Sequence, residues 1–307
     1  MRPSTGHRML SFVSETGQNG PPARLPMLTQ PSTRRNNTVA ALGEFVGTFL
    51  FLFFAFAGTQ IANTAPPAPE HGSDTPLANT SNLMFIALVF GMSLMANVWA
   101  FYRVALALFL VGGLSAIRLL VVLVAQFLGG IAAAALVSAL FPGPMTVATT
   151  LGGGANVAQG LFIEMFLTAQ LVFVIIMLAA EKHKSTYLAP IAIGIAFFLA
   201  ELVGVYFTGG SLNPARSLGP AVVSHSFPGY FWIYWLGPLL GSLLACGFYV
   251  LLKYLRWKEC NPGHDWDDVE KRDSERHLNS KESSNNSDSP IHNATNGNQV
   301  TGEQTGV

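Results

Sequence analysis

Residues 211–217, Ser-Leu-Asn-Pro-Ala-Arg-Ser, decide how the rest of the chain can fold. They lie between two apolar segments of membrane length. Asn213 is a residue type favoured at a helix N-cap, and Pro214 suits the first helical position, where no backbone N–H is needed. The stretch therefore predicts a short helix over residues 214–224, roughly 16 Å long and about half of a ~30 Å hydrocarbon core.

A half-helix at this depth must be surrounded by protein or line a water-filled cavity, because lipid cannot satisfy its end groups. Its positive N-terminal end, the Asn213 amide and the Arg216 guanidinium would offer hydrogen-bond donors to a passing solute. Asn-Pro is also a common turn dipeptide. However, Arg216 is the only cation between Lys184 and Lys253, which favours the half-helix over a surface turn.

The composition indicates a membrane protein. Half of the 307 residues are apolar, 11% are charged and the net charge is zero, so nothing favours binding of nucleic acid. The two cysteines indicate no disulfide framework. Six apolar runs have about the 20 residues that a spanning helix needs, and they cover residues 39–59, 83–102, 119–140, 157–180, 187–207 and 229–252. The sequence thus predicts an all-α membrane domain over residues 39–258, with disordered tails at 1–38 and 259–307.

Lysine and arginine residues predict the orientation of these spans. The loops 60–82 and 141–156 contain neither residue, whereas the loop after the fourth span carries Lys182 and Lys184. Lys253 and Arg256 follow the last span. Both termini are therefore expected in the cytoplasm, with the protein in the plasma membrane or an internal membrane.

The two halves of the chain resemble each other. Residues 44–48, which begin with Glu44, can be laid on residues 164–168, which begin with Glu164. Because each half has three predicted spans, the halves have opposite orientations and form an inverted repeat, which places a substrate path between them. Two glycine pairs also correspond, Gly91 with Gly194 and Gly129 with Gly241.

Glu44, Glu164 and Glu201 are the only acidic residues in the predicted spans. A carboxylate inside a membrane usually faces the protein interior and has a partner there. We expect Glu44 and Glu164 to brace the re-entrant loop of each half. The alternative is a proton relay, which needs a chain of titratable groups, and no predicted span contains a histidine. Gln126 is a further candidate for the interior.

Soluble enzyme chemistry finds no support in the sequence. It has no P-loop, no paired metal-ligand spacing and no Gly-x-Ser-x-Gly elbow. We therefore expect no catalytic residues, no metal and no cofactor, and we expect the protein not to be an enzyme.

Three motifs resemble the aquaporins, or major intrinsic proteins: TGGSLNPARS at 208–217, AELVG at 200–204 and WIYWLGP at 232–238. The resemblance covers about residues 39–258, and the long polar tails are most similar to those of filamentous-fungal members. It implies a six-helix bundle with two half-helices that meet at mid-membrane, usually assembled as a homotetramer with one pore per subunit. It also implies passive conduction of water across the lipid bilayer.

The resemblance assigns roles to particular residues. The pore motif would be Asn213, Pro214 and Ala215, and the selectivity filter would be Phe90, Glu201, Gly210 and Arg216. Water-type members resemble this chain at Ser217, Ala221, Tyr234 and Trp235. Water-selective members usually have histidine where Glu201 stands, so hydrogen peroxide or other small neutral solutes remain open as substrates.

The family has two Asn-Pro-Ala motifs, and this chain has one. Phe207 to Gly241 spans 34 positions, but the matching Val104 to Gly129 spans 25, so about nine residues are absent near Val104 and Leu106. Two functions therefore remain open. The chain is a passive channel for water and small neutral solutes centred on Asn213 and Arg216, or it is a homologue that conducts weakly or not at all.

Overall fold

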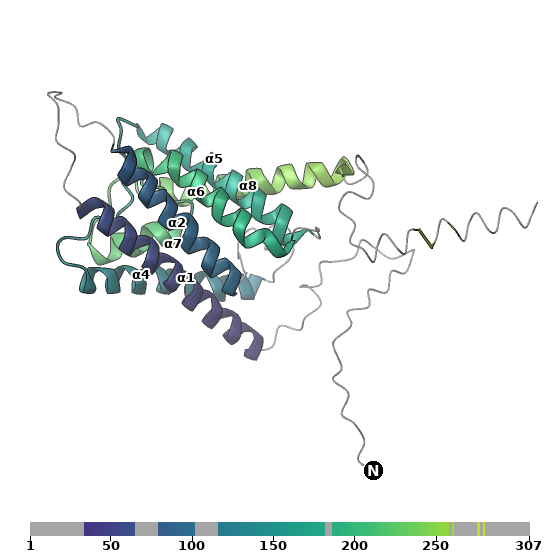
Figure 1. The fold of residues 1–307 in the computed structure, drawn as a ribbon, viewed down its shortest axis with the longest axis horizontal. Coiled ribbons are helices and arrows are strands. Elements are labelled where there is room, and N and C mark those ends of the chain that lie inside the picture. Colours follow the sequence, from purple (N-terminus) through teal and green to yellow (C-terminus); the bar gives the residue numbers. More distant parts are fainter. Residues whose placement is uncertain are drawn as a thin grey trace, which may run out of the picture. The chain divides into compact units, whose positions relative to one another are not determined.

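The computed structural model describes residues 34–64, 79–101, 116–181, 186–257, 260, 275–276 and 279. The chain divides after Leu255 into two units, and all the long helices belong to the first. The regular elements in the described part of the chain are all helical (Figure 1). The expectation of an all-α fold is therefore confirmed.

Among the described residues, six helices are long and apolar enough to cross a membrane, as the sequence predicts. They are α1 (Arg34–Thr64), α2 (Thr80–Phe101), α4 (Ala116–Leu140), α5 (Val157–Ile175, continued by the π-helix η2, Ile176–Ala180), α6 (Ala189–Thr208, preceded by the 3₁₀ turn η3, Thr186–Leu188) and α8 (Ile233–Tyr254). Their ends differ from the predicted ones by a few residues, because apolar runs do not mark the first and last helical turns. For example, α1 begins at Arg34 instead of 39.

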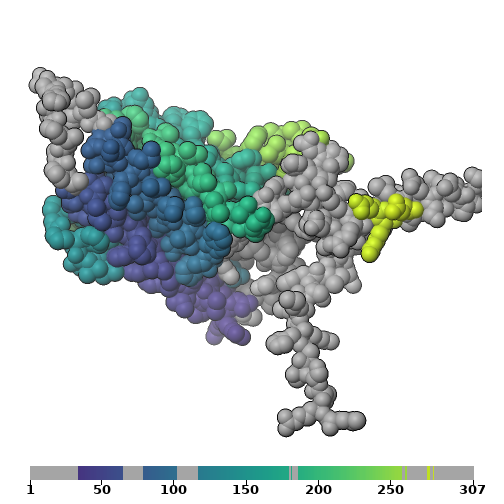
Figure 2. Space-filling view, in the orientation of Figure 1, coloured from purple at the N-terminus to yellow at the C-terminus, as the bar shows by residue number. Residues whose placement is uncertain are grey.

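The outer faces of these helices are apolar. Leu88 and Met92 of α2 are 47% and 55% exposed, and Leu199 and Val203 of α6 are 50% and 57% exposed. Figure 2 shows the surfaces of α2 (blue) and α6 (green) side by side on one face of the bundle. Large contiguous apolar surfaces are rare on proteins in water, so this face is suited to lipid.

The helices pack in the order α4, α1, α2, α6, α5, α8. The first half of the chain supplies α1, α2 and α4, the second half supplies α5, α6 and α8, and the halves meet where α2 contacts α6 (Figure 1). The short helix α7 (Pro214–Val223) packs mainly against α4. The second half thus sends its short helix into the first half, which interlocks the two.

Equivalent glycines make equivalent contacts in the two halves. A Cβ atom on Gly129 of α4 would lie 2.8 Å from the carbonyl oxygen of Phe45 of α1. A Cβ atom on Gly241 of α8 would lie 2.3 Å from the carbonyl oxygen of Met165 of α5. Phe45 and Met165 are matched positions of the repeat, so the repeat seen in the sequence is a repeat of helix crossings.

Candidate functional site

Asn213 begins α7 as its N-cap. Its backbone is extended (φ −144°, ψ 118°), and its Oδ1 accepts a hydrogen bond of 2.9 Å from the backbone N–H of Ala215. Pro214 occupies the first helical position. No described residue accepts a hydrogen bond from the amide nitrogen of Asn213. That N–H₂ group and the positive end of the helix together form a donor site.

Backbone contact holds α7 in place. A Cβ atom on Gly219 of α7 would lie 2.4 Å from the carbonyl oxygen of Gly130 on α4, and one on Gly130 would lie 2.6 Å from the carbonyl oxygen of Ala215. Two helices can approach so closely only where both lack side chains, which is a common packing device in membranes. The glycines therefore fix the depth and direction of the half-helix.

Glu164 of α5 holds the turn that leads into α7. Its Oε1 accepts a hydrogen bond of 3.0 Å from the N–H of Ser211, and its Oε2 accepts one of 2.8 Å from the N–H of Leu212. Leu212 has φ 48°, a left-handed conformation that is unfavourable for leucine. The buried carboxylate thus satisfies two backbone donors at a strained position of the turn.

Glu44, the repeat counterpart of Glu164, accepts a hydrogen bond of 3.0 Å from the Nε2 of Gln126 on α4. Gln126 is therefore an interior group, as expected. The loop that Glu44 would brace belongs to residues 102–115, which include the site of the missing motif near Val104 and Leu106. That segment lies outside the described residues.

Arg216 is 2% exposed and bonds to three backbone carbonyl groups. Its Nε donates to Gly210 at 2.9 Å, its Nη1 to Val147 at 2.6 Å and its Nη2 to Gly209 at 3.1 Å. The rings of two phenylalanines lie 5.4 and 5.1 Å from its guanidinium carbon, and they belong to Phe56 and Phe90. These contacts fix the guanidinium in one position.

Glu201 of α6, another of the proposed filter residues, is completely buried. In the described part of the chain, neither of its carboxylate oxygens has a hydrogen-bond partner. A Cβ atom on Gly210 would lie 1.8 Å from the Oε2 of Glu201. The carboxyl group therefore occupies space that only a glycine at position 210 leaves open. The structure thus brings Phe90, Glu201, Gly210 and Arg216 into one buried cluster.

Two further residues of the sequence-based assignment, Ser217 and Tyr234, bond to residues next to this cluster, whereas Trp235 is 39% exposed. The Ser217 hydroxyl accepts a hydrogen bond of 2.9 Å from Thr149 and lies 2.6 Å from the hydroxyl of Ser211. Tyr234 donates a 3.0 Å hydrogen bond to the carbonyl oxygen of Thr208 at the end of α6. Ala221 is buried, and the Trp235 ring is tilted against Phe127 at 5.4 Å.

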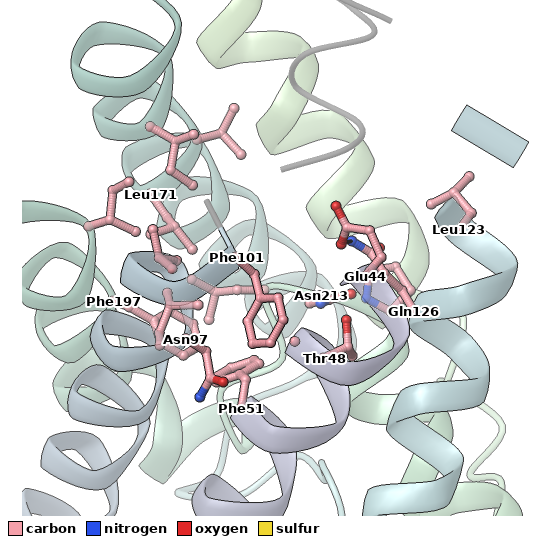
Figure 3. A pocket seen from close by; sticks show the side chains of 18 of the residues that line it. Glu44, Thr48, Phe51, Asn97, Phe101, Leu123, Gln126, Leu171, Phe197 and Asn213 are labelled. Atoms are coloured by element: carbon pink, nitrogen blue, oxygen red, sulfur yellow. Dashed lines mark hydrogen bonds between the residues drawn. The ribbon is translucent and has the colours of Figure 1, made fainter. Parts of the chain in front are cut away.

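A cavity of about 370 Å³ opens next to Asn213 (Figure 3). Most of its lining is apolar, but several polar side chains face it, among them Glu44, Thr48, Asn97, Gln126, Thr168, Asn213 and Ser242. The Oγ1 of Thr168 is buried and has no partner in the described part of the chain. A cavity of this size with polar groups on its wall can hold water that hydrogen-bonds to those groups. The described residues contain no cluster of ligating side chains that could hold a metal ion.

Sequence reasoning did not find several residues of this site. Val147 and Thr149 belong to the segment between α4 and α5, and nothing local in the sequence indicates that they contact Arg216 and Ser217. Phe51 and Phe197 line the cavity beside Asn213. The spacing of Phe197 and Glu201, one helical turn apart, is the only signal that could have drawn attention to that ring.

The six candidate spans indicate an integral, multi-pass membrane protein, and the short helix α7 places Asn213 at a cavity inside its helix bundle. The chain belongs to the major intrinsic protein family, whose model matches residues 32–249. Members of this family are passive channels, not enzymes.

The chain is similar to fungal proteins named as aquaporins. It is 56% identical over 240 residues to aquaporin-7 of Botryotinia fuckeliana, which is 75% of this chain and 53% of the relative. It is 51% identical over 237 residues to probable aquaporin-3 of Gibberella zeae, which is 74% of this chain and 82% of the relative. The chain therefore spans about half the length of aquaporin-7 and of some other relatives that it matches.

The fold is also similar to that of the aquaglyceroporin from Plasmodium falciparum, with a TM-score of 0.58. The match covers 69% of this chain and 95% of that protein at 20% sequence identity. At this identity the likeness concerns the fold and not the solute.

Proposed function

We propose that this protein is a passive transmembrane channel for water and small neutral solutes, with a pore that passes Asn213 and Arg216. The observation that carries the proposal is the position of Asn213. It caps a buried half-helix, lies on the wall of the cavity, and has an amide nitrogen that no described residue uses. Water moving past this point can exchange one hydrogen bond for another.

Charge at the site supports passage of neutral solutes. The N-terminal end of α7 is positive, and the Arg216 guanidinium adds a full positive charge next to it. Such a field repels protons and cations in channels of this kind. Glu201 adds a carboxyl group without a described partner, and this acceptor keeps hydrogen peroxide and other hydroxylated or amide solutes among the candidates.

The remaining parts of the proposal rest on the charge pattern of the sequence and on the resemblance of its motifs to the family. The channel domain covers residues 39–258 and assembles as a homotetramer in the lipid bilayer. The tails at 1–38 and 259–307 both face the cytoplasm, in the plasma membrane or an internal membrane, because the connections rich in lysine and arginine lie on that side.

The second candidate function is that of a homologue that conducts weakly or not at all. Two observations favour it. The sequence holds a single Asn-Pro-Ala motif. In addition, Phe90, Glu201 and Arg216 are 0%, 0% and 2% exposed, so the proposed filter is closed to water in this conformation.

Osmotic swelling of liposomes that contain the purified full chain distinguishes the two functions. A matched control carries an inserted loop of about ten residues with Asn-Pro-Ala between Val104 and Leu106, the length of a half-helix with its cap. If the native chain conducts water at the rate of the control, the channel function stands. If only the control conducts at equal protein density, the native chain is a silenced homologue.

A further inference from the structure

We propose that Phe51 and Phe197, together with the filter residue Phe90, form an aromatic gate that closes the pore on the cavity side of Arg216, and that Phe197 is the ring whose displacement opens it. This inference rests on the proposed channel function, because a gate has meaning only in a conducting protein.

The three rings come from three different helices and contact one another in pairs. Their centroids are 6.3 Å apart for Phe51 and Phe90, 5.7 Å for Phe51 and Phe197, and 5.8 Å for Phe90 and Phe197. All three contacts are edge-to-face, with interplanar angles of 75°, 64° and 66°. At such separations aromatic rings are in direct contact, so no water fits between them.

The rings stand between the two polar regions of the proposed pore. Phe51 and Phe197 line the cavity together with Asn213, and Figure 3 labels both rings on its wall. Phe90 lies behind them and faces the Arg216 guanidinium at 5.1 Å. None of the filter residues lines the cavity. On the side that Phe51 and Phe197 line, this ring layer therefore separates the cavity from the Arg216 guanidinium.

The state of Glu201 is a second, independent sign that the layer is closed. Its carboxylate oxygens are completely buried, so the protein leaves no water-sized space beside them. Water that entered from the cavity would hydrate this carboxylate. Apolar constrictions that exclude water in this way act as gates in channels.

In this proposal Phe197 is the ring that moves, because it also lies next to Glu201. It lies one helical turn from Glu201 on α6, so both residues face the same side of that helix. It also borders the cavity, which offers space for its ring. Phe90, in contrast, is held between the other two rings and the guanidinium.

The test measures osmotic water permeability in liposomes of phosphatidylcholine and phosphatidylglycerol, for the full chain and its variants at equal protein density. We expect Phe197→Ala to raise permeability about tenfold, because opening no longer requires the loss of two ring contacts. Phe197→Leu should give a smaller rise. The matched control is Phe166→Ala on α5, which removes a ring that is 60% exposed on the outer face.

A gain of permeability separates a gate from ordinary core packing, because a damaged core lowers activity. All variants are also prepared in the chain with the restored Asn-Pro-Ala loop. If the native chain conducts but Phe197→Ala conducts no better than its parent in either background, the gate is wrong and the channel function survives. If no variant conducts in either background, both the gate and the channel function are wrong.

Discussion

Gly91 of α2 and Gly194 of α6 lie directly against each other at the centre of the bundle. A Cβ atom on Gly91 would come within 2.8 Å of the carbonyl oxygen of Gly194, and one on Gly194 would come within 2.9 Å of the carbonyl oxygen of Gly91. The two residues are matched positions of the internal repeat. The contact between the halves is therefore symmetric, and each half presents the same glycine to the other.

This contact leads to a first prediction. Gly194→Ala should destabilise the protein by about 1–3 kcal/mol, because the added methyl group overpacks the α2–α6 crossing. The thermal unfolding midpoint of the purified protein in detergent measures the change. The control is Gly43→Ala on α1, where a Cβ atom would meet nothing within 4 Å. Equal midpoints for the two variants would contradict the close crossing.

The brace formed by Glu164 gives a second prediction. Glu164→Gln retains the shape of the side chain but leaves one backbone N–H, of Ser211 or Leu212, facing an NH₂ group. We expect a loss of about 1.5–3 kcal/mol, the value of a hydrogen bond to a charged group. The thermal midpoint should fall, and that of the outward-facing control Phe166→Leu should not. An unchanged midpoint in Glu164→Gln would mean that the carboxylate does not support the turn.

A third prediction concerns the space shared by Gly210 and Glu201. Gly210→Ala should be strongly destabilising, because its Cβ would meet the Glu201 carboxylate and because φ at position 210 is +63°. Glu201→Ala removes the clash, so the double variant retains only the backbone cost of about 1–2 kcal/mol. The double-mutant cycle should therefore show a coupling of about 1–3 kcal/mol. If the effects of the two substitutions simply add, the Glu201 carboxylate does not lie against position 210.

A fourth prediction tests Asn213 as a donor to the solute. Aspartate is as good an N-cap as asparagine, so Asn213→Asp should leave the thermal midpoint nearly unchanged. It removes the N–H₂ donor, and we expect water permeability to fall roughly fivefold, as the loss of about 1 kcal/mol implies. Leakage of cations should rise because the aspartate is negative. If the variant of a conducting chain has unchanged permeability, Asn213 does not donate hydrogen bonds to the solute in the pore.

A fifth prediction concerns a polar cluster at the end of α8 that the sequence did not reveal. Glu181, which is buried, accepts a hydrogen bond from Tyr249 and pairs with Lys253 at 2.9 Å. Tyr249→Phe should cost about 1.5–3 kcal/mol, since it removes a buried bond to a charged group. Lys253→Met should cost less than about 1 kcal/mol, because the lysine is 53% exposed. If Lys253→Met lowers the thermal midpoint more than Tyr249→Phe does, this prediction is wrong.

The sequence alone was sufficient for the parts of this protein that depend on local chemistry. Apolar runs of membrane length predicted the six spans, and an asparagine before a proline predicted the start of α7. Repeated glycines predicted the internal symmetry, because close helix crossings need glycine wherever they occur.

Contacts between distant segments were decided only by the tertiary structure. Val147 accepts a hydrogen bond from Arg216, and Glu201 lies beside Gly210 without an ion pair in the described part of the chain. Phe51 and Phe197 meet across the bundle although 146 positions separate them in the chain. A phenylalanine in an apolar helix looks the same in sequence whether it faces lipid, core or pore. Packing fixes the rotation of each helix about its axis. This rotation alone determines which side chains of the helix face the solute path.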